Sequence, residues 1–521
     1  MIELTLDDSK LFFNISNFQD IPPHEYKILK DSLYVLTDNY RFHPLFKKGL
    51  WNGKINFLIN DTKIPFGIYN EVRKILTSNN IECKINGLKN VIDKNFNIDE
   101  LEEWCNEFYS KRNSNIKLRY YQLEAVAKIL QTKRCILELA TSSGKTLIIF
   151  TAIAYMIEKH INNKFLIIVP RITLVEQIQS EFLNYLGNDN SSKYNMSLLF
   201  GGRKDIDTSK HNIFIGTYQT LTKISKEFFK QIDCCCCDEV HSASTKSIQN
   251  ICSMLINCHT RFGLSGTTKV TKNNHSLASK YTILSNFGPL VMKISSSKLS
   301  NEGFICKVNV NIKILDYLES DMKEKLIKFK KGTSPDNLAR VFTLEKKIAR
   351  DSQKRTNYIV KTLMKDIKTN TLLLFQSVSD KYGEMIANSL RIEYPDVDVY
   401  YISGSTSSKE RNDIIETISK NNNRISFLVA SYQILSTGVN IQNLHNLVML
   451  ESTKSETTVL QSLGRIMRLH KSKSEKQVTV YDLVDDFRFQ RNYNFLYKHH
   501  KERLKLYDQE NIDYNVENLI L

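Results

Sequence analysis

Residues 140–146, Ala-Thr-Ser-Ser-Gly-Lys-Thr, have the composition of a phosphate-binding loop. A short apolar run, Cys135–Leu139, precedes them, and an apolar helical stretch, Leu147–Met156, follows. A strand, a tight loop and a helix in this order place backbone N–H groups at a helix N-terminus, where they can surround phosphate groups. The pattern therefore predicts a site for a nucleoside triphosphate.

Within this loop each polar residue has a distinct expected role. Ser143 and Gly144 would help to form the phosphate cradle, Lys145 would reach the β- and γ-phosphates, and Thr146 would bind Mg²⁺. A bare Gly-Lys-Thr triplet is common, and Leu139 stands where the usual motif has its first glycine. The prediction therefore depends on the flanking strand and helix.

Two adjacent carboxylates, Asp238 and Glu239, follow the apolar run Ile232–Cys237. Ligands bind at the carboxyl ends of parallel strands, so Asp238 would coordinate Mg²⁺ and Glu239 would polarise an attacking water. A solvated loop is the alternative interpretation. A phosphate cradle combined with a metal-bound acid favours an ATPase.

Four consecutive cysteines, Cys234–Cys237, lie in the same run. Successive side chains of a strand point to opposite faces, so four thiolates cannot surround one tetrahedral ion. We expect these cysteines to pack in the core as small hydrophobes. Ten cysteines in 521 residues are too sparse for a disulfide scaffold, which favours a reducing cytosol, that of the host if the protein is viral.

Arg465 and Arg468 stand three residues apart near the end of the chain's second α/β part. On a helix they would share a face. Directed at a nucleotide, they could act as arginine fingers that stabilise transition-state charge. The alternative is a basic helix face on a soluble domain.

Composition limits the classes of protein to consider. The chain is 41% hydrophobic, enough for real cores, and 521 residues suggest three or four domains at about 150 residues each. Lys and Arg number 72 against 56 acidic residues, a formal charge of +16, which points to a polyanion such as nucleic acid. Solubility alone is the alternative. No apolar run reaches the roughly 18–20 residues of a membrane helix, and the N-terminus lacks the pattern of a secretory signal.

The elements that must position these residues are those of an α/β fold. Near-continuous apolar runs alternate with helical stretches, which predicts parallel sheets covered on both faces. The expected strands are Cys135–Leu139, Phe165–Val169, Ile213–Ile215, Ile232–Cys237 and Phe262–Leu264 in one sheet, and Thr371–Phe375, Val399–Ile402, Ser426–Val429, Leu447–Leu450 and Val478–Asp482 in another. We expect a small α+β domain at 1–110, two tandem α/β domains at 111–300 and 301–487, helices within 316–356, and a basic helical tail at 488–521.

Residues 40–54 carry four cations, no acid and several interleaved aromatics. Cations for phosphates and aromatics for base stacking make a nucleic-acid surface pattern; its members are Arg41, Lys47, Lys48, Trp51 and Lys54. Alternatively, the aromatics are the core of a small domain and the lysines are solvated around it. The basic tail Arg488–Lys505 is either a second DNA contact or a solvated helix face.

Seven blocks in the right order resemble the motifs of the superfamily 2 DExH helicases and translocases. They are Tyr120-Tyr121-Gln122 before the phosphate loop, Lys145-Thr146 (motif I), Val169-Pro170-Arg171 (motif Ia), Asp238–His241 (DExH box), Ser265-Gly266-Thr267 (motif III), Ser436–Asn440 (motif V) and Gln461–Arg468 (motif VI). The resemblance implies two RecA-like domains with ATP and Mg²⁺ bound between them.

It also implies roles for single residues. Nucleotide contacts are implied for Tyr121, Gln122, Gly438 and Gln461; coupling between the domains for His241, Ser265 and Thr267; and contacts to DNA phosphates for Arg171, Thr217, Ser403 and Thr437. Phosphate contacts carry little sequence information, so recognition of DNA structure rather than sequence is expected.

A closer resemblance is to the UvsW family, the recombination and fork-remodelling helicases of tailed phages. It rests on the blocks Tyr40–Pro44, Gly49–Lys54, Ile64–Gly67, Ser297–Leu299, Asn443–His445 and Asp482–Asp486. It implies an ATP-dependent enzyme that unwinds and branch-migrates forked and four-way DNA in recombination, replication-fork processing and repair. Branched DNA is then the expected partner, with single-stranded DNA and replication or recombination proteins as further candidates, and we expect a monomer.

Three other functions share features of this pattern. An RNA helicase or transcript-release translocase has the same core motifs. A DNA translocase that remodels or cleaves DNA with a partner, as in restriction complexes, needs no strand separation. The sequence shows no nuclease motif, which disfavours cleavage by the chain itself. A basic DNA-binding protein with a degenerate ATP site is disfavoured by the intact Lys145, Asp238, Glu239 and Arg465.

Overall fold

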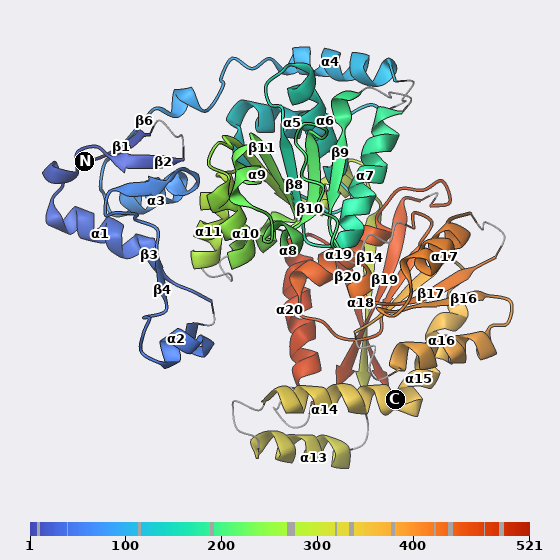
Figure 1. The fold of residues 1–521 in the computed structure, drawn as a ribbon. Helices are drawn as coiled ribbons and strands as arrows, with labels where there is room; N and C mark the ends of the chain where they lie inside the picture. Colours follow the sequence, from blue (N-terminus) through green and yellow to red (C-terminus); the bar gives the residue numbers. More distant parts are fainter. Residues whose placement is uncertain are drawn as a thin grey trace. The chain divides into compact units, whose positions relative to one another are not determined.

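A computed structural model describes the chain apart from residues 8–10, 39, 113–115, 188–191, 268–276, 318–319, 333–337, 377–380, 421–423, 436–440, 474 and 489–493. The chain forms two compact units (Figure 1). The first contains residues 1–139 and 143–294, and the second contains residues 140–142 and 295–521. Within the described part of the chain, no helix is long and apolar enough to cross a membrane.

The first unit is built on a seven-stranded parallel sheet with the order β13-β7-β12-β11-β8-β10-β9. Its strands are β7 (Arg134–Leu139), β8 (Phe165–Val169), β9 (Met196–Leu199), β10 (Ile213–Thr217), β11 (Cys234–Asp238), β12 (Thr260–Ser265) and β13 (Leu290–Ile294). β7, β8, β10 and β12 are buried along their whole length, as expected of apolar strands covered on both faces. The predicted parallel α/β sheet is confirmed.

Helices precede this sheet and connect its successive strands. They are α5 (Tyr120–Thr132), α6 (Lys145–Glu158), α7 (Ile172–Leu186), α8 (Tyr218–Leu221), α9 (Lys226–Lys230), α10 (Lys246–Met254) and α11 (Leu277–Phe287), with α4 (Ile98–Ser110) preceding them. The four cysteines of β11 are buried, and burial raises the pKa of each thiol well above its ordinary value. The prediction that they pack as core residues is confirmed.

A second seven-stranded parallel sheet, in the order β16-β17-β15-β18-β19-β14-β20, organises the second unit. Its strands are β14 (Lys307–Asp316), β15 (Thr371–Phe375), β16 (Asp398–Ile402), β17 (Ser426–Ser431), β18 (Asn446–Met449), β19 (Gln477–Asp486) and β20 (Asp513–Ile520). Its helices are α12 (Ser296–Asn301), α13 (Ser320–Lys331), α14 (Leu338–Asp351), α15 (Gln353–Asn357), α16 (Tyr382–Glu393), α17 (Ser408–Lys420), α18 (Tyr432–Leu435), α19 (Glu456–Ile466) and α20 (Phe495–Gln509). The helices α13–α15 confirm the prediction of helices within residues 316–356.

The end of the chain differs from the predicted helical tail. Helix α20 is followed by β20, which pairs in parallel with β14 over eight residues and so completes the second sheet. The strand is largely exposed and polar, Asp-Tyr-Asn-Val-Glu-Asn-Leu-Ile, and therefore lacks the apolar run by which the other strands are found. Residues 495–520 are part of the second α/β unit.

The N-terminal domain of the first unit has a mixed four-stranded sheet in the order β5-β2-β1-β6. Its strands are β1 (Ile2–Leu6), β2 (Phe12–Ile15), β5 (Lys63–Pro65) and β6 (Cys83–Asn86), and its helices are α1 (Pro23–Leu33) and α3 (Tyr69–Ser78). A separate antiparallel pair, β3 (Tyr34–Leu36) and β4 (Lys54–Asn56), leads to the short helix α2 (Pro44–Lys47). Figure 1 shows α2 at the far end of this pair, away from the four-stranded sheet.

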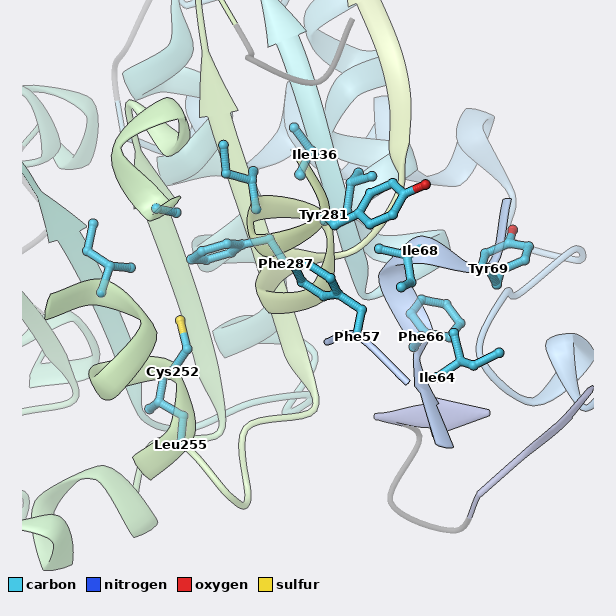
Figure 2. Packing of buried hydrophobic residues seen from close by; sticks show 14 of the residues in the cluster. Phe57, Ile64, Phe66, Ile68, Tyr69, Ile136, Cys252, Leu255, Tyr281 and Phe287 are labelled. Atoms are coloured by element: carbon cyan, nitrogen blue, oxygen red, sulfur yellow. The ribbon is translucent and has the colours of Figure 1, made fainter. Parts of the chain in front are cut away.

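The N-terminal domain shares one hydrophobic core with the large sheet of the first unit (Figure 2). The ring of Phe57 packs edge-on against Tyr281 of α11, with 5.4 Å between centroids. A Cβ on Gly67 would lie 1.7 Å from the Leu284 carbonyl oxygen, so glycine is required for this close approach. Lys280 adds an ion pair with Glu71, 2.6 Å between Nζ and Oε2. The domain is thus fused to α11 by packing.

Candidate ATP site and nucleic-acid contacts

The phosphate loop joins β7 to α6. Helix α6 begins at Lys145, and Gly144 precedes it with a left-handed φ of 85°. The backbone angle favours glycine, and a Cβ on Gly144 would lie 2.3 Å from the Gln122 side-chain nitrogen and displace that amide. Ser142 also has a positive φ, 69°. The Lys145 ammonium donates to the Leu139 carbonyl at 3.4 Å, across the base of the loop.

Two residues of α5, Tyr121 and Gln122, form hydrogen bonds with this loop. The Tyr121 hydroxyl donates to the Ser143 carbonyl at 3.0 Å, and the Gln122 amide donates to the same oxygen at 2.9 Å. The Gln122 carbonyl accepts from the Arg119 backbone N–H at 2.9 Å, which fixes the orientation of the amide. The structure therefore gives both residues a role in positioning the loop, while their contact with a base stays a prediction.

The carboxylate pair lies at the carboxyl end of β11. Burial and the charge of Glu239 raise the pKa of Asp238 above its ordinary value. Burial acts in the same direction on Glu239, but its hydrogen bond with His241 and the charge of Lys145 hold the pKa of Glu239 below its ordinary value. Glu239 also has a left-handed φ of 56°, a strained angle of the kind that occurs at functional sites. The charge of Lys145 acts on both carboxyls, which brings the loop and the acids into one site.

Glu239 is also joined to motif III by short polar contacts. His241 Nδ1 lies 3.1 Å from Glu239 Oε2 and 2.9 Å from the Ser265 hydroxyl. That hydroxyl lies 2.9 Å from Glu239 Oε2 and 2.9 Å from the Thr267 carbonyl, and it accepts from the Thr267 N–H at 3.3 Å. Because one hydroxyl proton serves two acceptors, a change at Glu239 alters the bonding at Thr267.

The residues expected to bind Mg²⁺ suit that ion. Thr146 is the second residue of α6, and Asp238 supplies a half-buried carboxylate at the end of β11. The described residues contain no group of three or more His, Cys, Asp or Glu side chains that could enclose a metal ion. Mg²⁺ is commonly bound by one or two carboxylates together with water and phosphate oxygens, so this sparse donor set fits it.

In the second unit, helix α19 carries Gln461 and Arg465 in its last two turns. The helix ends at Ile466, and Arg468 lies two residues beyond it. The expectation that Arg465 and Arg468 share a helix face is therefore wrong, because the chain leaves the helix between them. Both side chains are half-buried.

Lys473 fixes the segment that follows α19, and sequence reasoning did not identify it. Its ammonium is buried and donates to the carbonyls of Ile466 at 2.6 Å and Arg468 at 2.9 Å. The Cys306 N–H donates to the intervening Met467 carbonyl at 2.7 Å. Burial lowers the pKa of Lys473 to about 8. Nothing in the sequence separates Lys473 from the exposed lysines around it.

The expected phosphate contacts of the two large sheets differ in accessibility. Arg171, directly before α7, is exposed. Thr217 is 3% exposed and donates to the Thr220 hydroxyl, and Ser403 is 1% exposed with its hydroxyl 2.7 Å from that of Ser405. Both hydroxyls are buried in this structure, and their contact with DNA stays a prediction. Thr437 and Gly438 lie outside the described residues.

The basic cluster of residues 40–54 forms an arm between β3 and β4. We call residues 37–53 the arm; Asn39 is outside the described residues. Tyr40 packs on Phe46 with 4.8 Å between ring centroids, and His43 packs on Trp51 at 5.0 Å. The exposed cations around these rings are Arg41, Lys47 and Lys48, while Lys54 is half-buried with its ammonium 5.1 Å from the Tyr34 ring centroid. Trp51, expected to stack on bases, is thus engaged within the arm.

Two described arginines of the tail, Arg488 and Arg503, have structural partners. Arg503 is 1% exposed and forms a double hydrogen bond with Asp482 of β19, at 2.7 and 2.8 Å. Arg488 pairs with Asp486 of the same strand at 2.6 Å. A further pair, which is buried, joins Arg355 of α15 to Asp485 at 2.6 Å. Arg503 therefore joins α20 to the second sheet, whereas the Arg488 pair is local, and both pairs leave fewer of the tail's cations for DNA.

Comparison with known proteins identifies the family. Residues 115–270 match the family described as Type III restriction enzyme, res subunit, and residues 354–470 match Helicase conserved C-terminal domain. Residues 16–86 match DNA helicase UvsW, N-terminal. The chain is 33% identical over 508 residues to the ATP-dependent DNA helicase uvsW of Enterobacteria phage T4, covering 93% of this chain and 94% of that relative. The chain belongs to the UvsW helicase family.

As a member of the UvsW family, the protein is an ATP-hydrolysing DNA helicase of superfamily 2. Among solved structures, the crystal structure of T4 UvsW is 28% identical, covers 100% of this chain and 99% of its own, and has a TM-score of 0.48. A fragment of a putative HsdR subunit of a type I restriction enzyme from Vibrio vulnificus YJ016 is 16% identical with a TM-score of 0.53, over 77% of this chain and 68% of that chain. The second likeness shows a shared fold.

Proposed function

We propose that this UvsW-family helicase unwinds and branch-migrates forked and four-way DNA in recombination, replication-fork processing and repair. The observation that carries the proposal is the cationic arm on a domain packed against the ATP-binding sheet. A motor acting on plain duplex or single strands needs only its two motor domains. An arm that shares a core with one of them can grip a second DNA segment while the motor moves the first.

In the proposed ATP site, Lys145 contacts the β- and γ-phosphates, and Thr146 and Asp238 hold Mg²⁺. Mg²⁺ held by these two residues would neutralise charge on the phosphate oxygens. Glu239, the more acidic of the two carboxyls, orients the attacking water. Arg465 and Arg468 supply positive charge to the transition state.

The contacts between Glu239, His241 and Ser265 would couple this chemistry to movement. When Glu239 turns toward the attacking water, it releases the Ser265 hydroxyl, which is then bonded only to Thr267. Motif III precedes α11 in the chain, and α11 is the helix on which the N-terminal domain packs. The hydrolysis step and the arm are thus linked through one helix of the first unit.

The proposed contacts to DNA are mainly to phosphates, from Arg41, Lys47 and Lys48 of the arm and from Arg171. Such contacts carry no direct sequence information, so the enzyme selects branched DNA by shape. Their contribution falls with ionic strength, because each neutralised phosphate releases counterions.

The test compares ATPase stimulation by forked DNA, linear single strands and RNA, and then migration of a four-way junction. We expect the greatest stimulation by forked DNA, and Lys145→Ala should abolish stimulated turnover while the fold is intact. Exposed Lys159, at the other end of α6, provides the matched Lys159→Ala control. Preferential stimulation by RNA would instead support the RNA helicase alternative.

The arm is tested with the double variant Lys47→Ala/Lys48→Ala. We expect binding of forked DNA to weaken about tenfold at moderate salt and the slope of log K against log salt to fall by about one to two. Basal ATPase without DNA should be unchanged. The control is Lys89→Ala/Lys94→Ala, which removes two exposed lysines of the N-terminal domain outside the arm. Equal losses in both double variants would contradict a specific role of the arm.

A further inference from the structure

The arm carries an apolar tip that no fold contact explains. Phe42 and Leu50 are each 72% exposed, and Leu45 is 46% exposed. The three lie within nine residues of one another on the segment between β3 and β4. Isolated exposed apolar residues are ordinary, but a cluster of large ones on a short projecting segment indicates a binding surface.

We propose that Phe42 and Leu50 form a wedge that inserts between bases at a DNA branch point. The idea rests on the proposed function and deepens it, because it assigns strand separation to the tip and phosphate binding to the cations beside it. Apolar side chains such as Phe and Leu are the residue types that proteins insert between base steps to unstack them.

The arm's own packing shows that the tip is not a disrupted core. The rings available for internal packing are already used, Tyr40 against Phe46 and His43 against Trp51. Trp51 also donates from Nε1 to the Lys54 carbonyl at 2.8 Å. The arm therefore has a small core of its own, and Phe42 is left outside it.

The backbone of the arm holds the tip in a defined shape. The Leu50 N–H donates to the Leu45 carbonyl at 2.9 Å, and the Thr37 N–H donates to the Gly53 carbonyl at 2.9 Å. Gly53 has a φ of 80°, and a Cβ there would lie 2.5 Å from the Tyr40 ring, so only glycine closes the arm in this way. A wedge needs such a fixed shape, because a disordered tip would fold away instead of separating bases.

The charge around the tip favours nucleic acid as the occupant. Residues 40–54 include Arg41, Lys47, Lys48 and Lys54 and no acidic residue. Cations that bind the phosphates on both sides of an apolar tip place that tip over the bases between them. An apolar surface for a protein partner would need no cation at each of these positions.

The experiment uses the full-length double variant Phe42→Ser/Leu50→Ser and forked DNA with 2-aminopurine at the branch nucleotide. Wild type should raise the fluorescence of 2-aminopurine on binding, because the probe brightens when it unstacks. The double variant should lose this rise, and its rates of fork unwinding and junction migration should fall about tenfold or more. ATPase stimulated by single-stranded DNA should stay within about twofold of wild type.

The matched control is Ile392→Ser, which removes an 83% exposed apolar side chain on α16 in the other unit. Because the substituted side chains are exposed, all variants should unfold at the same temperature as wild type. If the double variant separates strands and brightens the probe as wild type does, the wedge is refuted, and the surface serves another partner. If wild type itself does not process forks, the proposed function fails before the wedge is tested.

Discussion

The ammonium of Lys473 fixes the backbone beside Arg465 and Arg468, the two arginines proposed to act in ATP hydrolysis. It binds two carbonyls on either side of Met467, at the point where α19 ends and the chain turns toward Arg468. A cation at a helix C-terminus also interacts favourably with the helix dipole. We therefore regard Lys473 as a positioning residue for Arg465 and Arg468, one that does not itself touch nucleotide.

Replacing Lys473 by Met should lower kcat of DNA-stimulated ATP hydrolysis about tenfold and leave nucleotide affinity nearly unchanged. The Met side chain fills the same space without a buried charge, so the fold should persist, which thermal unfolding checks. Lys473→Arg should restore part of kcat, and Lys471→Met, at an exposed neighbour, should have no effect. Loss of nucleotide binding in step with kcat would speak against a positioning role.

For single residues, the sequence pointed to those that belong to a motif. It missed residues whose contacts depend on how distant segments meet in the fold. The proposed roles of Lys145, Asp238 and Glu239 rest on residue type and spacing after an apolar strand. The contacts of Lys473 and the buried state of Thr217 depend on which chain segments meet. Spacing along one segment does not contain that information.

Between elements, α20 and β19 are joined by buried polar groups. Asp482 accepts two bonds from Arg503 and one from the Tyr507 hydroxyl at 3.0 Å. His500, one turn before Arg503, is 1% exposed. Burial lowers the pKa of His500 to about 4, with the charge of Asp482 opposing this shift and that of Arg503 adding to it.

This shift predicts acid sensitivity of the second unit. A histidine whose folded pKa lies below its unfolded value stabilises the fold above the unfolded pKa, about 6.5, and loses that contribution as pH falls toward 4. His500→Gln should therefore flatten the fall in unfolding free energy between pH 6.5 and 4, by at most about 3 kcal/mol. Urea unfolding across this range measures it, with His24→Gln at an exposed site as the control. An unchanged pH slope in His500→Gln would contradict the assignment.

Strands were predictable where both faces are covered by helices. Such strands are continuous apolar runs, and Phe165–Val169 and Thr371–Phe375 have the predicted bounds. Strand β14 alternates buried and half-buried residues, and β20 is mostly exposed, so neither forms an apolar run. A search for buried strands therefore found the centre of each sheet. It missed β13 and β9 at the two edges of the first sheet, and β14 and β20 toward one edge of the second.

Over the whole first unit, the N-terminal domain and the ATP-binding sheet behave as one body because their apolar residues form one cluster. Removing residues 1–110 would expose Tyr281 and Phe287, which are at most 1% exposed in the intact chain. Deletion of the domain is thus a poor probe of DNA binding, and changes confined to the arm are better. The +16 charge predicted a polyanionic partner. Composition cannot, however, locate the packed boundary between the N-terminal domain and α11, which we call the seam.

Gly67→Ala tests the seam directly. The added Cβ would meet the Leu284 carbonyl, a backbone atom that cannot turn aside, so α11 and the N-terminal domain must separate slightly. We expect a loss of about 1–3 kcal/mol in the unfolding free energy, the usual cost of overpacking. Chemical unfolding measures it, and Gly404→Ala, with open space around its Cβ, is the control. Equal stability of the two variants would show that the contact is not tight.

The seam at Gly67 also bears on how such proteins can be recombined. A domain connected to its neighbour only by a linker can be exchanged between relatives, because no packing contacts cross the linker. Here the backbone around Gly67 and the outer face of α11 are shaped to each other, and Glu71 meets Lys280 across the same boundary. A chimera that brings in a foreign N-terminal domain should fold only if it brings the matching α11 with it. The unit that must be exchanged as a whole is thus the N-terminal domain together with α11, which lies about 200 residues further along the chain.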